Sequence, residues 1–354
     1  MTQQRTQWIG YATGLWSLAY GALGAWWALG GAGFPFGVGD PELMAEPEIA
    51  FRVSLLGRAT PEVAGWIIAL FGLLGAAAAF LMARNANRPG QKPLLTGVGL
   101  VFAVGLGILV QDYRTLIVVA YTPVLAVSKP LFGWPEGAGW GDLYLTPRLH
   151  LLMLLLAGIA WAVTTAGYRA RLAGGSTHSE ALQRWGKAAT WTAVAMPVLY
   201  CATRWAWALG FSLGIDPDMY REGQEDGLWF AGAALATLGL VGAVLTMGLV
   251  QRWGEVFPRW MIGLRGRRVP PMLAVVPAVI VGALVASAGM MYVRIVAVEG
   301  VAPDTWPLNL PEVLFTVWGA ALIVAALAYR QRRLAAEAPA RAEDRGGLEC
   351  APQS

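Results

Sequence analysis

Long runs of apolar residues constrain this chain more than any other feature of its sequence. A helix needs about 20 mostly apolar residues to cross a bilayer, and eight such runs are present. They lie at residues 8–30, 64–83, 94–113, 149–168, 189–213, 228–250, 272–293 and 313–329. None of them shows the ten-residue alternation of a membrane barrel, so the sequence predicts an all-α membrane protein with eight transmembrane helices.

The composition points to the same environment. Of the 354 residues, 56% are hydrophobic and only 14% are charged, whereas a soluble domain is about 25% charged. A large core alone does not explain so low a share of charged residues. The first run, 8–30, is longer than the apolar part of a cleaved signal peptide, which has about 7–15 residues. We therefore expect it to be retained as the first helix.

The charges between the runs predict an orientation. On the side that carries the N-terminus there are 18 Lys and Arg residues, against 5 in the opposite loops. Because cytoplasmic loops carry the excess of Lys and Arg, both termini are expected in the cytoplasm. Acidic residues divide the other way, with 15 outside and 6 inside. The net charge of +4 thus averages a basic inner face and an acidic outer face. It gives no reason to expect nucleic-acid binding.

The two halves of the chain resemble each other at a constant offset. Residues 20–30 and 200–210 are identical at six of eleven positions, including a Trp-Ala-Leu-Gly ending. Weaker matches pair Tyr168 with Tyr329 and Pro147 with Pro311. Because four helices are an even number, two such units insert with the same orientation. We therefore predict two parallel four-helix repeats.

This pattern divides the chain into four parts. The first repeat is expected at 1–172, a basic cytoplasmic linker at 173–188 and the second repeat at 189–334. The tail 335–354 is rich in Ala, Glu, Arg and Gly and is expected to be a disordered cytoplasmic segment.

Two further segments are expected on the outer side. The segment 31–63 contains an amphipathic stretch that could lie at the membrane interface. The segment 115–146 contains three prolines and several glycines. Both are therefore interpreted as substantial features of the outer face.

Several chemistries lack the residues they need. Cys201 and Cys350 are far apart, so neither a disulfide framework nor a Cys-x-x-Cys pair can form. The only histidines, His150 and His178, are too few for a bundle with several haems or a His-rich zinc site. The three lysines lie outside the apolar runs, so a retinal-type Schiff base has no nitrogen. We expect no cofactor and no metal.

Ionisable residues near the outer ends of the predicted helices form the candidate site. From the helical rise, Asp112, Arg114 and Arg204 reach the outer leaflet. Charges inside a membrane are costly unless they are paired or face a cavity, so we interpret this layer as a substrate-binding site. Its members are Arg204, Asp112, Arg114, His150, Arg148, Tyr200, Trp207, Arg294 and Glu312.

Arg204 is the first choice within this set. The matching repeat position is Gly24, and the neighbouring Tyr200, Trp205 and Trp207 could form an aromatic wall. The alternative is structural. Arginines at helix ends can reach lipid phosphates, or can pair with acidic residues and lock the bundle.

His150 has two interpretations as well. A histidine titrates near neutral pH and could carry protons. A single histidine at the membrane interface is, however, more often a structural residue. The sequence indicates no catalytic residue.

Two motifs carry a resemblance. The Tyr-x6-Trp-Ala-Leu-Gly element, together with Gln-Arg-Trp-Gly-Glu-Val-Phe-Pro-Arg-Trp at 251–260 and Gly-Arg-Arg-Val-Pro at 266–270, resembles uncharacterised polytopic membrane proteins of high-GC actinobacteria. A preference for Arg over Lys, 23 to 3, agrees with such a source. The resemblance implies a bacterial cytoplasmic membrane. It implies no known activity, cofactor or catalytic residue.

Three functions stay open. The first is a transporter of a small anionic or lipid-like molecule, in which two four-helix units enclose a polar path. The second is a non-catalytic membrane subunit or assembly factor, for which packed small-residue faces suffice. The third is a membrane enzyme acting on a lipid-linked or terpenoid substrate, with Asp112 or His150 as acid or base. The partners compatible with all three are the lipid bilayer, a second copy of the chain or a membrane partner subunit.

Overall fold

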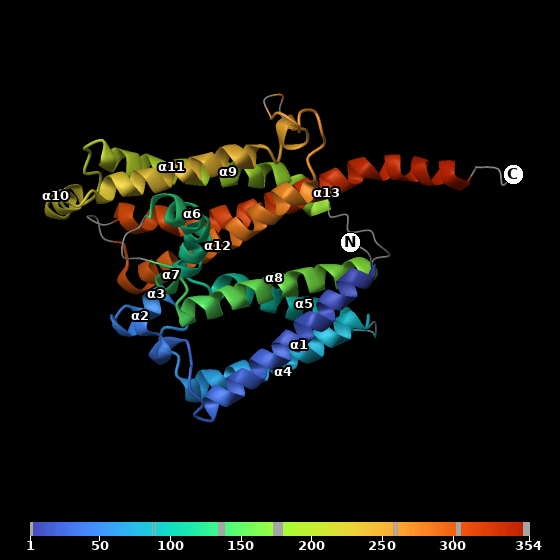
Figure 1. The fold of residues 1–354 in the computed structure, drawn as a ribbon, viewed down its shortest axis with the longest axis horizontal. Helices are drawn as coiled ribbons and strands as arrows, with labels where there is room; N and C mark the ends of the chain where they lie inside the picture. The colour runs from blue at the N-terminus through green and yellow to red at the C-terminus, as the bar shows by residue number, and fades with distance from the viewer. Residues whose placement is uncertain are drawn as a thin grey trace. The chain divides into compact units, whose positions relative to one another are not determined.

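The computed structural model describes residues 3–86, 88, 90–133, 139–172, 180–257, 259, 261–301 and 306–349. Within these ranges every regular element is a helix (Figure 1). β-structure in this part of the chain is limited to one isolated antiparallel bridge between Val256 and Arg268. The prediction of an all-α fold is confirmed.

Among the described residues, six helices are long and apolar enough to cross a bilayer, so the chain is a multi-pass membrane protein. Their membrane-competent parts are α4 (Pro61–Ala83), α5 with the π-helical turn η2 (Gln91–Leu109), α8 (Thr146–Leu172), α11 (Leu228–Met247), α12 (Pro271–Glu299) and α13 (Trp306–Ala336). The α5 helix proper ends at Val104 and η2 covers Gly105–Leu109. Five of the six have a mean hydropathy of 1.9 or above over their most apolar window, against 1.8 for α5 with η2.

The other two predicted spans are helices of lower hydropathy. They correspond to α1 (Gln3–Ala28) and α9 (Glu180–Ala208), which have 26 and 29 residues. Both are long enough to cross a bilayer. Both helices contain glycine, tryptophan, tyrosine and threonine among their apolar residues, and these lower the mean hydropathy. Neither helix is therefore among the six apolar helices.

The third predicted span ends earlier than expected. The sequence predicts a helix from 94 to 113, but the helical run stops at Leu109 and a new helix, α6 (Tyr113–Phe132), begins after Asp112. Asp112 is the N-cap of α6, because its side chain accepts a hydrogen bond from the backbone N–H of Arg114. The placement of Asp112 within a span was therefore wrong. Pro123 and Pro130 lie inside α6 without ending it.

Short helices complete the segments between the long ones. They are η1 (Gly37–Gly39), α2 (Pro41–Met44), α3 (Ala50–Val53), α7 (Trp140–Leu143), α10 (Pro217–Glu225) and η3 (Arg252–Gly254). Asp40 caps α2 and Asp216 caps α10, and each is followed by a proline at the first helical position. That combination is a standard helix start.

The tail differs from its prediction. Helix α13 runs from Trp306 to Glu349, so the backbone of 335–349 is helical. The Ala, Glu and Arg residues that made the tail look disordered are also strong helix formers. The last five residues, 350–354, lie outside the described residues, as do 173–179 of the predicted linker.

The chain divides into two compact units. Unit 1 comprises Met1–Thr177 and Ser287–Gly300, and unit 2 comprises His178–Ala286 and Val301–Ser354. The division at 177 falls inside the segment predicted as a linker. The stretch 287–300, expected in the second repeat, groups with unit 1.

Helix crossings in unit 1 depend on glycine. Helices α1 and α4 lie side by side (Figure 1), and Gly21 meets Gly72 where they touch. A Cβ added to Gly72 would lie 2.4 Å from Gly21 Cα and 2.6 Å from the Ser17 carbonyl oxygen. Such contacts let two backbones approach closely, and that proximity stabilises helix pairs in lipid.

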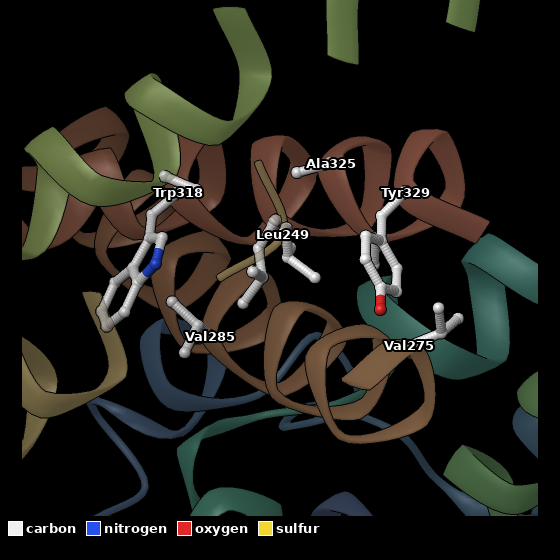
Figure 2. Packing of buried hydrophobic residues seen from close by; sticks show 9 residues of the cluster. Leu249, Val275, Val285, Trp318, Ala325 and Tyr329 are labelled. Atoms are coloured by element: carbon white, nitrogen blue, oxygen red, sulfur yellow. The ribbon is translucent and has the colours of Figure 1, made fainter. Parts of the chain in front are cut away.

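Unit 2 has one main apolar core, shown in Figure 2. Trp318 and Tyr329 of α13 lie on either side of Leu249, which follows α11, and Val275 and Val285 of α12 lie below them. The Tyr329 hydroxyl leaves this core to donate to the Gly254 carbonyl at 2.7 Å. The core therefore joins α12 and α13 to the end of α11.

The glycine crossing in unit 1 yields a first prediction. Replacing Gly72 by alanine forces the two backbones apart, and we expect a loss of about 1–3 kcal/mol, measured as a lower midpoint of thermal unfolding in nanodiscs. Gly97→Ala is the matched control. Gly97 also lies in a helix, but nothing lies within 4 Å of an added Cβ there. An equal effect of both variants would show that close packing at Gly72 is not the cause.

Candidate functional site

The predicted site residues fall into both units. Asp112, Arg114, Arg148, His150 and Arg294 belong to unit 1, whereas Tyr200, Arg204, Trp207 and Glu312 belong to unit 2. The single layer expected from the sequence stays a prediction. Each group is described within its own unit.

Arg114 is the centre of a buried ion network in unit 1. Its side chain is 3% exposed and lies among three carboxylates. Asp112 takes two of its hydrogen bonds, at 2.8 and 3.1 Å. Nη1 donates to Asp40 Oδ2 at 2.6 Å and to Glu42 Oε2 at 3.3 Å. We call these four residues, together with Arg148, the Arg114 network.

Helix starts hold the two buried carboxylates in place. Asp40 Oδ1 accepts from the backbone N–H groups of Glu42 and Leu43 at the start of α2, while its other oxygen faces Arg114. Asp112 Oδ1 accepts from the backbone N–H of Arg114 at the start of α6. Each carboxylate is therefore oriented by a helix N-terminus, which favours its negative charge.

A second set of bonds fixes the break before α6. The Gln111 amide donates to the carbonyls of Leu106 and Leu151 at 2.7 and 3.0 Å. The Thr115 hydroxyl donates to Gln111 Oε1 at 2.7 Å. These bonds attach the end of η2 and the start of α6 to α8, and so they position Arg114.

Arg148 extends the network from the start of α8. It forms two hydrogen bonds with Glu42, at 2.5 and 3.1 Å. Its Nη1 reaches the carbonyls of Asp142 and Leu143 at 3.1 and 3.4 Å. Arg148 therefore donates to carbonyls at the C-terminal end of α7.

Glu42 stays ionised in this setting. Burial acts to raise the pKa of Glu42, but hydrogen bonds and charges from Arg148 and Arg114 outweigh it and hold the pKa below its usual value. With all groups ionised, three carboxylates face two guanidinium groups. The Arg114 network therefore carries a net charge of about −1.

His150 lies in an aromatic cluster. Its Nδ1 is 3.0 Å from the Tyr20 hydroxyl, and the rings of Trp27 and Phe36 lie 5.6 and 6.0 Å away. Trp27 also packs edge-on against Phe34 at 5.6 Å. The two interpretations of His150, proton carrier and structural residue, both stay predictions.

Arg294 supports the backbone of α3. Its guanidinium donates to the carbonyls of Arg52 and Val53 at 3.2 and 2.8 Å. Arg52 in turn forms an ion pair with Glu299. Arg294 therefore satisfies carbonyls at the end of a short helix.

Unit 1 contains two small cavities. One has a volume of about 130 Å³ and is bordered by members of the Arg114 network. Its lining comprises Glu42, Leu43, Glu46, Ile49, Val53, Tyr113 and Arg114. The other, of about 270 Å³, is lined by Gly33, Phe34, Pro35, Gly39, Pro41, Leu145, Thr146 and Pro147.

Arg204 in unit 2 is paired in a different way. It forms an ion pair with Glu312, and its Nη1 donates to the Pro307 carbonyl at 3.1 Å. Pro311 lacks the N–H that would bond to the Pro307 carbonyl four residues earlier, so this acceptor is open to Arg204. The guanidinium carbon lies 4.7 Å from the Tyr200 ring centroid and 4.3 Å from that of Trp207.

The two rings are held by further contacts. Tyr200 packs against Phe315, and Trp207 Nε1 donates to the Leu213 carbonyl at 3.0 Å. The Tyr220 hydroxyl donates to the Trp207 carbonyl at 2.7 Å. Trp205, which was expected in the aromatic wall, is 43% exposed and bonds to Thr237 instead.

Sequence reasoning missed three participants. Asp40 and Glu42 were counted as outer-loop charges, although the Asp-Pro-Glu order at 40–42 signals a helix N-cap. Pro307 was not considered, although its spacing from Pro311 predicts an open carbonyl. No sequence signal pairs Asp40 with Arg114, which is 74 residues away.

Comparison with known proteins adds no relative: no family model, curated protein or solved structure matches this chain. Among the residues that the structure describes, no three His, Cys, Asp or Glu side chains gather in a way that could hold a metal ion.

The Arg114 network yields a second prediction. Arg114→Gln leaves Asp40 and Asp112 buried without a counter-charge, and we expect a loss of about 3–5 kcal/mol. Denaturant unfolding followed by tryptophan fluorescence measures it. Arg221→Gln is the control, because its ion pair with Asp218 is largely exposed and such pairs contribute about 0–1 kcal/mol. Similar losses in both variants would contradict the network's importance.

Proposed function

We propose that the protein is a non-catalytic subunit or assembly factor of a bacterial cytoplasmic membrane. The observation that supports this role is the state of the four candidate arginines. Arg114, Arg148 and Arg204 are paired with carboxylates, and Arg294 donates to two backbone carbonyls. None of them presents an unpaired guanidinium to an incoming anion, and buried ion pairs of this kind serve to hold elements in register.

The charges also argue against the anionic ligand expected from the sequence. An anion entering the Arg114 network would meet a net charge of about −1. An anion at Arg204 would have to displace Glu312, which is 2% exposed. Both steps are unfavourable where little water is present to compensate.

A second candidate function rests on the 130 Å³ cavity. It borders Glu42, Tyr113 and Arg114, so it offers polar groups to a small molecule. That arrangement favours binding of a small polar molecule over an anion.

The proposed topology has eight membrane-spanning helices in two parallel repeats, with both termini in the cytoplasm. It treats α1 and α9 as spans alongside the six apolar helices. From the resemblance to actinobacterial membrane proteins, we further propose that the chain lies in the cytoplasmic membrane of such a bacterium.

Matching contacts in the two units support the repeat. In unit 1 the Tyr168 hydroxyl donates to the Ala86 carbonyl at 2.6 Å, and Arg171 donates to the Met82 carbonyl at 2.9 Å, both at the end of α4. In unit 2, Tyr329 and Arg332 stand at the same spacing on α13. Tyr329 donates to the Gly254 carbonyl and Arg332 donates to the Leu249 carbonyl. Both carbonyls follow α11 in the chain. Each fourth helix thus closes the end of its second helix.

The topology can be tested by cysteine labelling. In a Cys350→Ser background, where Cys201 is buried, we expect Glu48→Cys and Glu222→Cys to react with an impermeant maleimide in intact cells. Arg88→Cys should react only after permeabilisation. Three apolar helices separate Glu48 from α9, so Glu222 shares its side only if α9 crosses. Labelling of these two positions from opposite sides would contradict the repeat.

An N-terminal epitope completes this test. If α1 crosses the membrane, the N-terminus lies on the cytoplasmic side and position 48 lies on the outer side. An antibody should therefore reach the epitope only in permeabilised cells. Detection in intact cells would mean that α1 does not cross.

The subunit role predicts that the protein tolerates replacement of the Arg204–Glu312 ion pair by two apolar side chains. In Arg204→Met combined with Glu312→Leu neither position carries a buried charge, so the double variant should fold and keep its partner. The measurement is cross-linking in native membranes, followed by identification of partners that co-purify in fixed stoichiometry. Either single variant serves as the control, because it leaves one buried charge unpaired. The proposal is contradicted if no partner is recovered and the purified protein moves a small solute across proteoliposomes.

A further inference from the structure

One buried carboxylate in unit 2 has an oxygen that is not satisfied by the described residues. Glu312 is 2% exposed, and its Oε1 pairs with Arg204. Its Oε2 is buried and has no hydrogen-bond partner in the described part of the chain. The same holds for Thr316 Oγ1. Residues four apart lie on one face of a helix, so Glu312 and Thr316 stand on the same face of α13.

The Thr316 hydroxyl lacks a bond that many threonines in the long helices form. A threonine hydroxyl in a helix commonly donates to the carbonyl four residues earlier. Six described threonines do so at 2.5–2.9 Å: Thr13, Thr122, Thr165, Thr190, Thr237 and Thr246. The Thr316 hydroxyl does not, and it has no other partner in the described part of the chain.

The chemistry of these atoms restricts what can bind. The free oxygen of an ionised carboxylate is an acceptor, so the occupant must donate a hydrogen bond. Arg204 already neutralises Glu312, and a further buried charge would be unfavourable. A hydroxyl group meets both conditions, because it donates to Glu312 and accepts from Thr316.

We propose that Glu312 and Thr316 form a buried binding site for the hydroxyl group of a small neutral molecule. Two sources supply that chemistry, water and the headgroup hydroxyl of a lipid. The sequence predicts that an anion binds to Arg204. Here the group without a partner is instead the Glu312 carboxylate, which binds a hydrogen-bond donor. The site does not depend on the proposed subunit role.

The sign of a stability change tests this site. Thr316→Val keeps the shape and β-branching but removes the hydroxyl. A bound hydroxyl then loses one partner, so the unfolding midpoint of the full-length protein should fall by about 2 °C or more. If nothing binds, removing an unsatisfied buried hydroxyl leaves the midpoint unchanged or raises it. Thr316→Ser keeps the hydroxyl and should stay closer to the wild type.

Two lipid compositions separate the sources. The variants are measured in nanodiscs of phosphatidylglycerol, whose headgroup carries hydroxyls, and of phosphatidylcholine, whose headgroup carries none. A lower midpoint of Thr316→Val in both lipids identifies water, and a lower midpoint only in phosphatidylglycerol identifies the lipid hydroxyl. An unchanged or higher midpoint in both lipids overturns the proposal. So does an equal loss in Thr316→Ser, because the effect would then come from packing.

A methyl NMR measurement gives a direct readout. In threonine-methyl-labelled protein, the Thr316 methyl should show a cross-peak to water or to headgroup protons. Thr246, whose hydroxyl is bonded to its own helix, is the internal control. No cross-peak at Thr316 beyond that of Thr246 overturns the site.

Discussion

A buried guanidinium must be neutralised wherever water cannot reach it, and the environment of Arg114 follows from that requirement. Of its two main counter-charges, Asp112 is close to it in sequence and Asp40 is 74 residues away, yet each is an N-cap of a helix. The same carboxyl group thus begins a helix and binds the arginine. As a result, the positions of α2 and α6 are tied to one side chain.

Unit 2 meets the same requirement with fewer charges. Arg204 has one carboxylate, one backbone carbonyl and two aromatic faces. Aromatic rings attract a cation without bringing a second charge into the membrane. Both units therefore contain buried arginines that are paired with carboxylates, although their other partners differ. Pairing of this kind stabilises a particular arrangement of helices more than it prepares a site for an anion.

The sequence predicts the long helices well because their apolar runs are set by bilayer thickness, a local property. Prediction from the sequence fails where tertiary contacts determine the end of a helix or the partner of a side chain. The break at Asp112 is one case, since the helix ends there through a cap and through the bonds of Gln111 to α8. The candidate residues were recognised individually, because a charge in an apolar run is conspicuous. Their partners were not, because the pairing of Arg114 with Asp40 depends on how distant segments meet.

The bond from Arg204 to the Pro307 carbonyl also limits how unit 2 can move. A side chain that is bonded to a backbone carbonyl fixes both the rotation and the axial position of one helix against the other. Farther along α13, Tyr329 donates to the Gly254 carbonyl. Sliding of α13 past its neighbours by one turn, a common shear motion in helical proteins, would break both attachments. Conformational change in this unit is therefore expected as rotation of the whole group of helices, with little sliding between them.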